Sequence, residues 1–242
     1  MMILINLIGN ADGLGDIRKK ELKKSAIQLG LRNESDTYVV DDPIHFPDSM
    51  TKIWSKSDIS NLLATAFAPD FVPSHNDNHA TSNKKRTTTS NTNRNKDKPP
   101  KVTIDILLTF DQKGISNHPN HRSLYHGAIH FLNTLIKDKP SGYSNPVTLY
   151  TLTTTNILRK YLGVLDVPTT MISGILAKLN VYTSKSNSRD YPRRLLFVNS
   201  IQEWLTAQSA MVKAHQSQMV WFRWGWITIG RYMVVNDLRR EV

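Results

Sequence analysis

Short apolar runs alternate along the chain with segments whose apolar residues recur every three or four positions. The apolar runs, which predict strands, cover residues 2–8, 37–43, 102–110 and 145–152. The helix-like segments cover residues 16–29, 58–67, 156–165 and 200–213, and a further helix begins near residue 119. Strands that alternate with helices are typical of an α/β fold with a mainly parallel sheet. The 242 residues are enough for one domain with a buried core, so we predict a single domain over residues 1–242.

The helix that begins near residue 119 has the clearest core face. Leu124, Ala128, Leu132 and Leu135 follow one another at a spacing of about four, which places them on one side of a helix. Pro119 suits the first turn, because the N–H that proline lacks would have no helical partner there.

Residues 72–100 interrupt this pattern with Thr, Ser, Asn and Pro and no apolar periodicity. Between residues 84 and 101 there are seven basic residues and one acid, which supply +6 of the net charge of +11. Such a composition cannot bury a core, and we predict a disordered insertion within the domain. Since the basic residues between 84 and 101 lie in such a stretch without interleaved aromatic residues, we expect no nucleic-acid partner.

The chain has no cysteine, so any metal must be held by His, Asp, Glu or water. It also has no P-loop motif and no complete GxGxxG after a strand, which disfavours a nucleotide-binding enzyme.

The C-terminal segment 215–242 is rich in aromatic and basic residues. Aromatic rings beside arginines suit a membrane interface, whereas a buried C-terminal helix explains the same composition. Both interpretations stay open at this stage.

The loop "DQKGISNHPNH" (111–121) carries the most informative chemistry. Asp111 directly follows a predicted strand, and ligands in α/β sheets bind beyond the carboxyl ends of strands. His118 and His121 lie three residues apart at a helix start, so both can face one site as a metal ligand and an acid–base group. A polar loop that merely starts a helix is the alternative.

Three other features have simpler explanations. His75 and His79 lie in the polar insertion, and His126 and His130 occupy the middle of a helix with no carboxylate beside them. Arg18 follows a glycine-rich loop, where it can bind phosphate or sugar hydroxyls, but spacing alone favours an exposed arginine at a helix start.

Four blocks, "GNADGLGDIRKKEL" (9–22), "TFDQKGISNHPNH" (109–121), "TTTNILRKYLGVLD" (153–166) and "HQSQMVWFRWGWITIGRYM" (215–233), resemble the LmbE-like deacetylases, in particular the branch that acts in GPI-anchor synthesis. The blocks keep the family's order and span nearly the whole chain apart from the insertion. The resemblance implies a Rossmann-like fold and zinc-dependent hydrolysis of the N-acetyl group of the glycolipid N-acetylglucosaminyl-phosphatidylinositol. It also implies a membrane surface as a partner, at the cytoplasmic face of the endoplasmic reticulum.

The resemblance assigns roles to four residues. His121 matches the family's zinc ligand, and His118 matches the histidine that stabilises or protonates the reaction intermediate. Asp111 matches the acidic position that supports the loop, and Arg18 the arginine associated with substrate contact.

The chain also departs from the family pattern. The His-Pro-Asp-Asp-Glu motif that supplies two further zinc ligands and the general base precedes the first block in the family, and this sequence does not contain it. We therefore expect a sheet without its first strand, poor zinc binding and an inactive, N-terminally truncated chain. The alternative is a non-catalytic binding or scaffold protein of this fold at the membrane.

Overall fold

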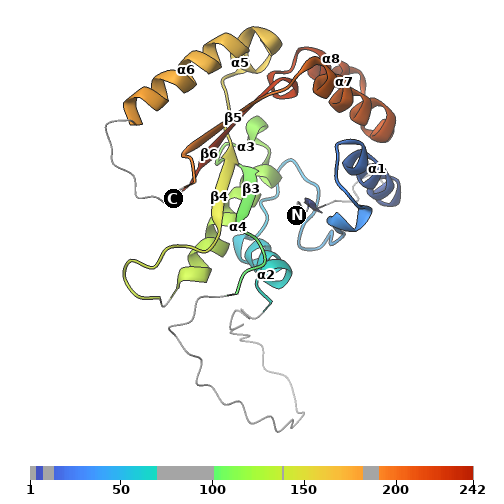
Figure 1. Cartoon of the computed structure of the whole chain (residues 1–242). Coiled ribbons are helices and arrows are strands. Elements are labelled where there is room, and N and C mark those ends of the chain that lie inside the picture. The colour runs from blue at the N-terminus through green and yellow to red at the C-terminus, as the bar shows by residue number, and fades with distance from the viewer. Residues whose placement is uncertain (1–3, 8–13, 70–100, 138, 182–190, 242) are drawn as a thin grey trace.

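The computed structural model describes residues 4–7, 14–69, 101–137, 139–181 and 191–241 (Figure 1). The strands are β1 (Leu4–Leu7), β2 (Thr37–Val40), β3 (Ile106–Phe110), β4 (Thr148–Leu152), β5 (Arg194–Val198) and β6 (Val235–Arg240). The α-helices are α1 (Gly15–Gln28), α2 (Lys56–Phe67), α3 (Gly114–Asn117), α4 (Pro119–Ile136), α5 (Ile157–Lys160), α6 (Asp166–Val181), α7 (Ile201–Ser209) and α8 (Trp221–Ile229). The α/β class expected from the sequence is confirmed.

Within the described residues the strands form two separate sheets. β1 and β2 pair in parallel, and a second sheet has the order β3-β4-β6-β5. β3 and β4 are parallel in the register Phe110↔Leu152, while β6 runs antiparallel to both of its neighbours. The parallel pairs agree with the prediction, and the antiparallel pair β5–β6 adds a feature that the sequence pattern did not indicate. That a first strand is missing stays a prediction.

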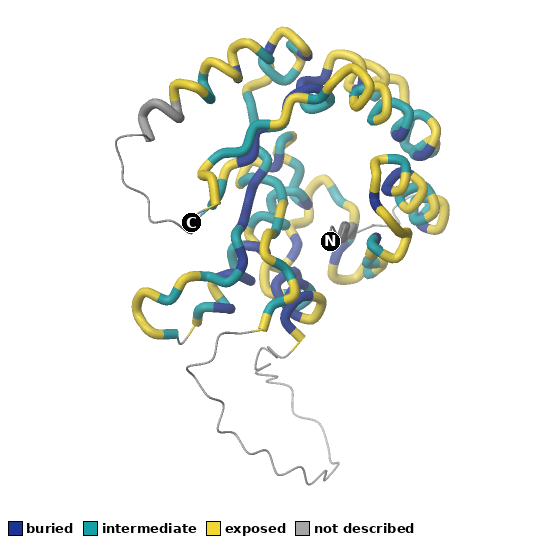
Figure 2. The backbone as a smooth tube through the Cα atoms, viewed as in Figure 1, coloured by how far each residue is buried: buried dark blue, intermediate teal, exposed yellow. Residues whose placement is uncertain are grey.

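The main hydrophobic core lies between α2, α4 and β4. It contains Phe131, Leu132 and Leu135 of α4 and Ile59 and Leu63 of α2, all buried. Figure 2 shows buried stretches concentrated in this region, while the outer helices α6 and α7 are largely exposed. The predicted core face of α4 is thus confirmed, with Leu124 packed at its margin.

The close packing of α2 on α4 depends on a glycine. Gly127 lies on the buried side of α4, and a Cβ atom at this position would clash with the side chain of Ile59. The two helices therefore approach more closely than any larger residue permits.

Hydrogen bonds tie helix α1 to the C-terminal part of the chain. The Glu21 carboxylate accepts hydrogen bonds from the N–H and the hydroxyl of Ser217 at 2.8 and 2.6 Å. Two turns further on, the Gln28 amide donates to the Ser209 hydroxyl at 2.7 Å. The first and last of the four sequence blocks are therefore neighbours in space.

A buried ion-pair network joins the third and fourth blocks. Asp166, at the start of α6, accepts hydrogen bonds from Arg159, Arg231 and Thr170. Burial alone would raise the pKa of the Asp166 carboxyl, but these hydrogen bonds hold it well below its ordinary value. The network anchors α5 and α6 to the segment that follows α8.

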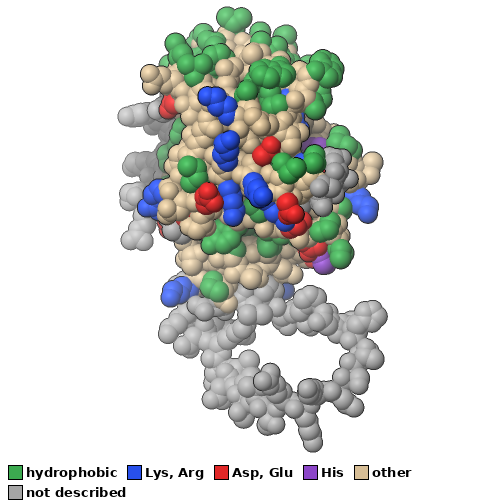
Figure 3. Space-filling view, turned by 90° about the vertical axis from the view of Figure 1, so that its right-hand side faces the viewer, with side chains coloured by type: hydrophobic (Ala, Val, Ile, Leu, Met, Phe, Trp, Pro, Cys, Tyr) green, Lys and Arg blue, Asp and Glu red, His purple; other side chains and the backbone are tan. Residues whose placement is uncertain are grey.

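Helix α8 is not a buried C-terminal helix. Of its residues only Ile227 is buried, and Trp221 is 85% exposed. Together with α5 and the turn at 163–165 it presents large exposed hydrophobic side chains, which we call the apolar surface: Ile157, Leu158, Val164, Leu165, Trp221, Phe222, Trp224, Trp226 and Ile229. Figure 3 shows hydrophobic side chains gathered at the top of the molecule, where α5 to α8 lie in Figure 1. Among the described residues, no helix is both long and apolar enough to cross a membrane.

Two helices of the structure differ from the prediction made from the sequence. Helix α6 occupies residues to which the sequence pattern assigned no element, and the predicted helix 156–165 is only one turn, α5, followed by a 3₁₀ turn. Residues 70–100, which contain the predicted insertion 72–100, lie outside the described residues, so that prediction and the single-domain prediction both stand as they were.

Candidate active site

Asp111 organises the loop at the carboxyl end of β3. Its Oδ1 atom accepts hydrogen bonds from the N–H groups of Lys113 and Gly114 at 3.0 and 2.9 Å and from the Thr154 hydroxyl at 2.5 Å. Its Oδ2 atom accepts one from the Thr154 N–H at 2.6 Å. Because Thr154 follows the parallel neighbour β4, this carboxylate joins the ends of two adjacent strands. Asp111 thus lies where the sequence predicted, and its four hydrogen bonds suit the loop-supporting role that the resemblance assigns to it.

The loop held by Asp111 has a strained backbone. Gly114, Ile115 and Asn117 have φ angles of 61°, 62° and 60°, and a β-branched residue such as Ile115 rarely adopts a positive φ. Such strain costs about 1–3 kcal/mol per residue and persists only where the surroundings enforce it. Here the Thr154 hydroxyl accepts from the Ile115 N–H at 2.9 Å, and the Lys160 ammonium lies 3.5 Å from the Ile115 carbonyl oxygen.

The strained loop fixes the orientation of His121. The Nδ1 atom of His121 lies 3.0 Å from the Gly114 carbonyl oxygen, and its ring stacks on Phe110 at 4.1 Å between centroids. A carbonyl oxygen only accepts, so Nδ1 carries the proton and Nε2 has the free lone pair. Burial is the main cause that lowers the pKa of His121. The Gly114 hydrogen bond opposes it, and the nearby charges of His118 and Lys160 lower the pKa further. A neutral imidazole with a carbonyl behind it is the usual form of a histidine metal ligand.

His118 has the opposite arrangement. It is the N-cap of α4, and its Nδ1 atom accepts the Asn120 N–H at 3.2 Å. In the neutral ring the proton therefore lies on Nε2, which makes that atom a hydrogen-bond donor. The two rings are 5.3 Å apart between centroids. The two histidines thus present a hydrogen-bond donor, Nε2–H of His118, and a free lone pair, on Nε2 of His121, at one site.

Arg18 reaches the same region through Asp48. Its guanidinium lies 3.8 Å from the Asp48 carboxylate, which also accepts from the buried Asn120 amide at 3.5 Å. The Arg18 side chain is only 16% exposed, so the interpretation as an exposed helix-start arginine is wrong. Arg223 of α8 is also near, since burial and then the charge of Arg18 lower its pKa.

Sequence reasoning missed Asp48, Thr154 and Lys160. The contact between Thr154 and Asp111 could have been predicted, because Thr154 follows a predicted parallel strand that ends at the same sheet edge. Asp48 lies in an irregular stretch and Lys160 in a one-turn helix, and no periodic pattern marks either of them.

The described residues supply only some of the ligand atoms that the expected zinc site needs. His121 offers a suitable Nε2 atom, but the described residues contain no group of three or more His, Cys, Asp or Glu side chains that could hold a metal ion. Asp111 serves to hold the loop, since its Oδ1 atom accepts three hydrogen bonds and its Oδ2 atom one. The described residues therefore provide one fitting zinc ligand.

The other histidine pairs add nothing to this site. His126 is exposed and His130 half-buried on α4, which agrees with the interpretation as an ordinary helix face. His75 and His79 lie outside the described residues.

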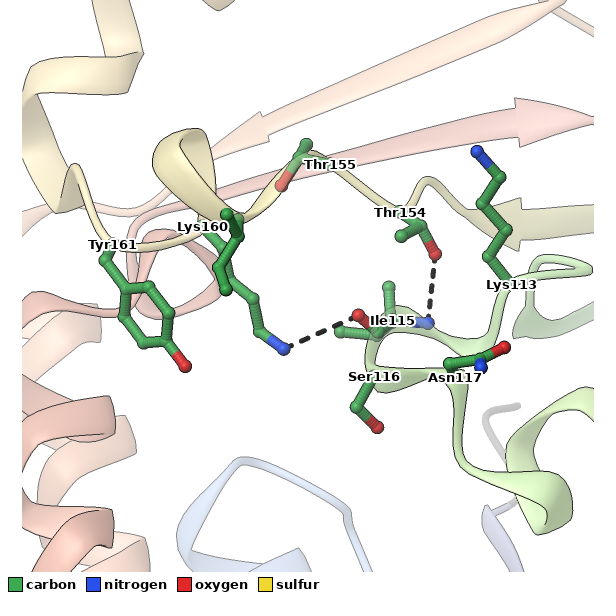
Figure 4. Close-up of a pocket in the computed structure, with 9 residues that line it drawn as sticks. Lys113, Ile115, Ser116, Asn117, Thr154, Thr155, Lys160 and Tyr161 are labelled. Atoms are coloured by element: carbon green, nitrogen blue, oxygen red, sulfur yellow. Dashed lines mark hydrogen bonds between the residues drawn. The ribbon is translucent and has the colours of Figure 1, made fainter.

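A cavity of about 430 Å³ adjoins the loop on the side of α5 (Figure 4). Ile115, Ser116 and Asn117 line one wall, and Thr154, Lys160 and Tyr161 line the other. The cavity therefore lies between the histidine loop and the apolar surface, to which the neighbouring lining residue Ile157 belongs.

Residues 5–132 match the family model described as "PIG-L: GlcNAc-PI de-N-acetylase". The chain is 51% identical to the Arthroderma benhamiae protein named "N-acetylglucosaminyl-phosphatidylinositol de-N-acetylase", over 99% of this chain and 71% of the relative. It is 30% identical to the Schizosaccharomyces pombe protein named "Probable N-acetylglucosaminyl-phosphatidylinositol de-N-acetylase", over 96% of this chain and 71% of that one. It is 29% identical to a Bos taurus protein with the same name as the first, over 98% and 71%. No solved structure matches the chain significantly.

Proposed function

Because the chain belongs to the PIG-L family of GlcNAc-PI de-N-acetylases, we propose that it hydrolyses the N-acetyl amide of N-acetylglucosaminyl-phosphatidylinositol in GPI-anchor synthesis. The observation that supports this most directly is the histidine pair at the end of β3, in which hydrogen bonds orient the two rings in opposite ways. His118 presents an N–H group and His121 a lone pair. Amide hydrolysis needs both a group that donates to the reacting oxygen or nitrogen and a site that activates water.

In this reaction the oxygen of water bonds to the acetyl carbon, the C–N bond breaks, and the amine of glucosamine leaves with a proton. The Nε2–H group of His118 donates to the oxygen on which negative charge develops, or gives its proton to the departing amine. Asp111 keeps the loop and both rings in place, and Arg18 contacts the substrate. Zinc, bound through Nε2 of His121, would supply a more acidic water and polarise the carbonyl.

The substrate's name includes phosphatidylinositol, so its acyl chains lie in a bilayer. We assign the apolar surface to contact with that bilayer. Trp221, Trp224 and Trp226 are exposed there, and the Lys160 ammonium lies 4.7 Å from the Trp226 ring centroid. Amphipathic rings with a nearby cation suit the level of the lipid headgroups. The surface continues through Ile157 into the cavity beside loop residues 115–117, so a lipid-embedded substrate can reach the site without leaving the membrane. By the family resemblance this membrane is the endoplasmic reticulum, at its cytoplasmic face.

Catalysis is tested by acetate release from N-acetylglucosaminyl-phosphatidylinositol in the presence of zinc. The assay uses the 242-residue chain and the longest translated product of the same gene, each with its zinc content measured. We expect the activity of the active form to be lost on His121→Ala together with bound zinc, and to be kept in His126→Ala, which changes an exposed histidine on the same helix. That the 242-residue chain is itself inactive stays a prediction, which the same assay checks.

Two results contradict the proposed hydrolysis. One is the absence of acetate release by the longest product with zinc bound, which favours the non-catalytic binding protein. The other is full activity of His121→Ala.

Membrane contact is tested by sedimentation with vesicles of phosphatidylcholine and phosphatidylinositol. We expect the double variant Trp221→Ser, Trp224→Ser to lose most of its binding. The matched control is Ile44→Ser, Ile53→Ser, because both isoleucines are exposed but lie outside the apolar surface. Equal loss in the two double variants would contradict the assignment.

A further inference from the structure

The cavity beside the histidine loop contains a cation, Lys160, that pairs with no carboxylate of the described residues. Within the described part of the chain, Lys160 forms no ion pair with a carboxylate, and its ammonium lies 3.5 Å from the Ile115 carbonyl oxygen. Burial lowers the pKa of Lys160, and no nearby acid opposes this effect. A partly desolvated ammonium of this kind is stabilised by any anion that enters the cavity.

Uncommitted hydroxyl groups face the same space. Figure 4 shows Lys160 and Tyr161 extending from one wall and Ser116 from the other. Among the described residues, the hydroxyls of Ser116 and Tyr161 form no hydrogen bonds. The cavity therefore offers the partly buried Lys160 ammonium, a second lining lysine, Lys113, and at least two free hydroxyls to a ligand. This combination suits an anionic group carried by a polyol.

The order of groups along the structure matches the order of groups in the substrate. The Gly114 carbonyl contacts His121, and the carbonyl of the next residue, Ile115, faces Lys160. Beyond Lys160 come Trp226, 4.7 Å away, and the rest of the apolar surface. In a glycosylated phosphatidylinositol the amide, the inositol, the phosphodiester and the acyl chains follow one another in the same sequence.

We propose that this cavity binds the phosphoinositol part of the substrate, with the Lys160 ammonium paired to the phosphodiester and the Ser116 and Tyr161 hydroxyls directed at the phosphate and the inositol. This inference rests on the proposed function for the identity of the ligand. Lys160 is thereby a specificity-determining residue, which distinguishes an anionic glycolipid from a neutral N-acetylglucosaminide.

A purely structural role for Lys160 makes different predictions. A lysine that only supports the strained Ile115 backbone would lower the melting temperature when replaced and would weaken every ligand equally. A phosphate-binding lysine weakens only phosphodiester ligands, and arginine restores the effect because it keeps the charge.

The test measures binding of glycerophosphoinositol, myo-inositol and inorganic phosphate to the 242-residue chain by calorimetry. The variants are Lys160→Met, which keeps an apolar stem against Trp226, and Lys160→Arg. The control is Lys56→Met, because Lys56 is an exposed lysine at the start of α2 and does not line the cavity. We expect glycerophosphoinositol to bind better than either of the other two, and its affinity to fall about tenfold in Lys160→Met, as for loss of one hydrogen bond to a charged group. Lys160→Arg should recover most of the affinity, and Lys56→Met should change it less than twofold, roughly the effect of a screened distant charge.

Three outcomes overturn the proposal: equal binding of glycerophosphoinositol and myo-inositol, no effect of Lys160→Met, or inorganic phosphate binding as well as glycerophosphoinositol, which would indicate a general anion site. The result is independent of hydrolysis. Lys160-dependent binding without acetate release contradicts only the proposed activity, and acetate release with Lys160-independent binding contradicts only this inference.

Discussion

The carbonyl oxygen of Gly114 lies 3.0 Å from Nδ1 of His121, and a Cβ atom at Gly114 would lie only 2.8 Å from Cβ of the same histidine. One residue therefore both sets the protonated nitrogen of His121 and leaves room for its side chain. The positive φ of Gly114, 61°, makes the conformation accessible to glycine above all.

The first prediction follows from this contact. Gly114→Ala should destabilise the protein more than Gly142→Ala, although both glycines have a positive φ, because Gly142 has no atom within 4 Å of the added methyl group. The positive φ lowers the free energy of unfolding of both variants by about 1–2 kcal/mol. Overpacking at Gly114 lowers it further, by about 1–3 kcal/mol. Denaturant unfolding measures the difference, and NMR of the His121 ring should shift in Gly114→Ala alone. Equal losses in the two variants would show that the contact is unimportant.

The second prediction separates the two tasks of His118, which is the N-cap of α4 and the proposed proton donor. Asparagine is a good N-cap but supplies no imidazole, so His118→Asn should keep the free energy of unfolding within about 0.5 kcal/mol. Its kcat in the active form should fall about 10²–10⁴-fold, as for loss of a general acid. His126→Asn, on the exposed side of the same helix, should retain activity. A His118→Asn variant as active as the wild type would exclude His118 from the chemistry.

The third prediction concerns the buried pair between Asp166 and Arg231. Asp166→Asn leaves the Arg231 guanidinium, whose side chain is 1% exposed, without its carboxylate, which should cost about 3–5 kcal/mol. Asp237→Asn breaks a pair of similar geometry with Arg194, but that arginine is 32% exposed and water can solvate it, so the cost should be about 1 kcal/mol or less. Chemical denaturation of the two variants gives the comparison. A smaller loss for Asp166→Asn than for Asp237→Asn would contradict the role of burial.

The fourth prediction is a pH dependence of stability at His215. Burial lowers the pKa of His215 below its ordinary value of 6.5, and the charge of Arg223 lowers it further against the opposing charge of Glu21. On acidification the unfolded chain therefore takes up a proton at His215 before the folded chain does. The contribution to stability is complete above pH 6.5 and is lost as the pH falls through the folded-state pKa.

Replacing this residue tests the sign. His215→Gln should lose less stability than the wild type between neutral pH and the acidic side of this window, when melting temperatures are compared. His126→Gln should follow the wild-type curve, since it removes an exposed histidine. A steeper acid loss in His215→Gln would show that the sign is wrong.

The parts of the fold that local pattern controls could be predicted. Leu132 and Leu135 repeat at helical spacing, and that spacing alone places them against a core. Pro119 indicated that α4 begins near it, because its missing N–H suits the first turn, and α4 begins at Pro119. The antiparallel strands β5 and β6 were not predicted, since their pairing joins residues about forty positions apart and no short-range signal specifies it.

The sequence by itself determined which chemical groups stand at the end of β3: an aspartate, two histidines three residues apart, and the family pattern that carries them. Only the tertiary structure decided what each nitrogen can do. The Gly114 carbonyl and the Asn120 N–H orient His121 and His118 in opposite ways. The first contact depends on a strained loop that Asp111, at the end of β3, and Thr154, after the neighbouring β4, hold in place. The tertiary structure also places Arg18 beside Asp48 and Lys160 at the cavity. Such contacts between distant segments depend on packing and directional hydrogen bonds, which local sequence patterns do not encode.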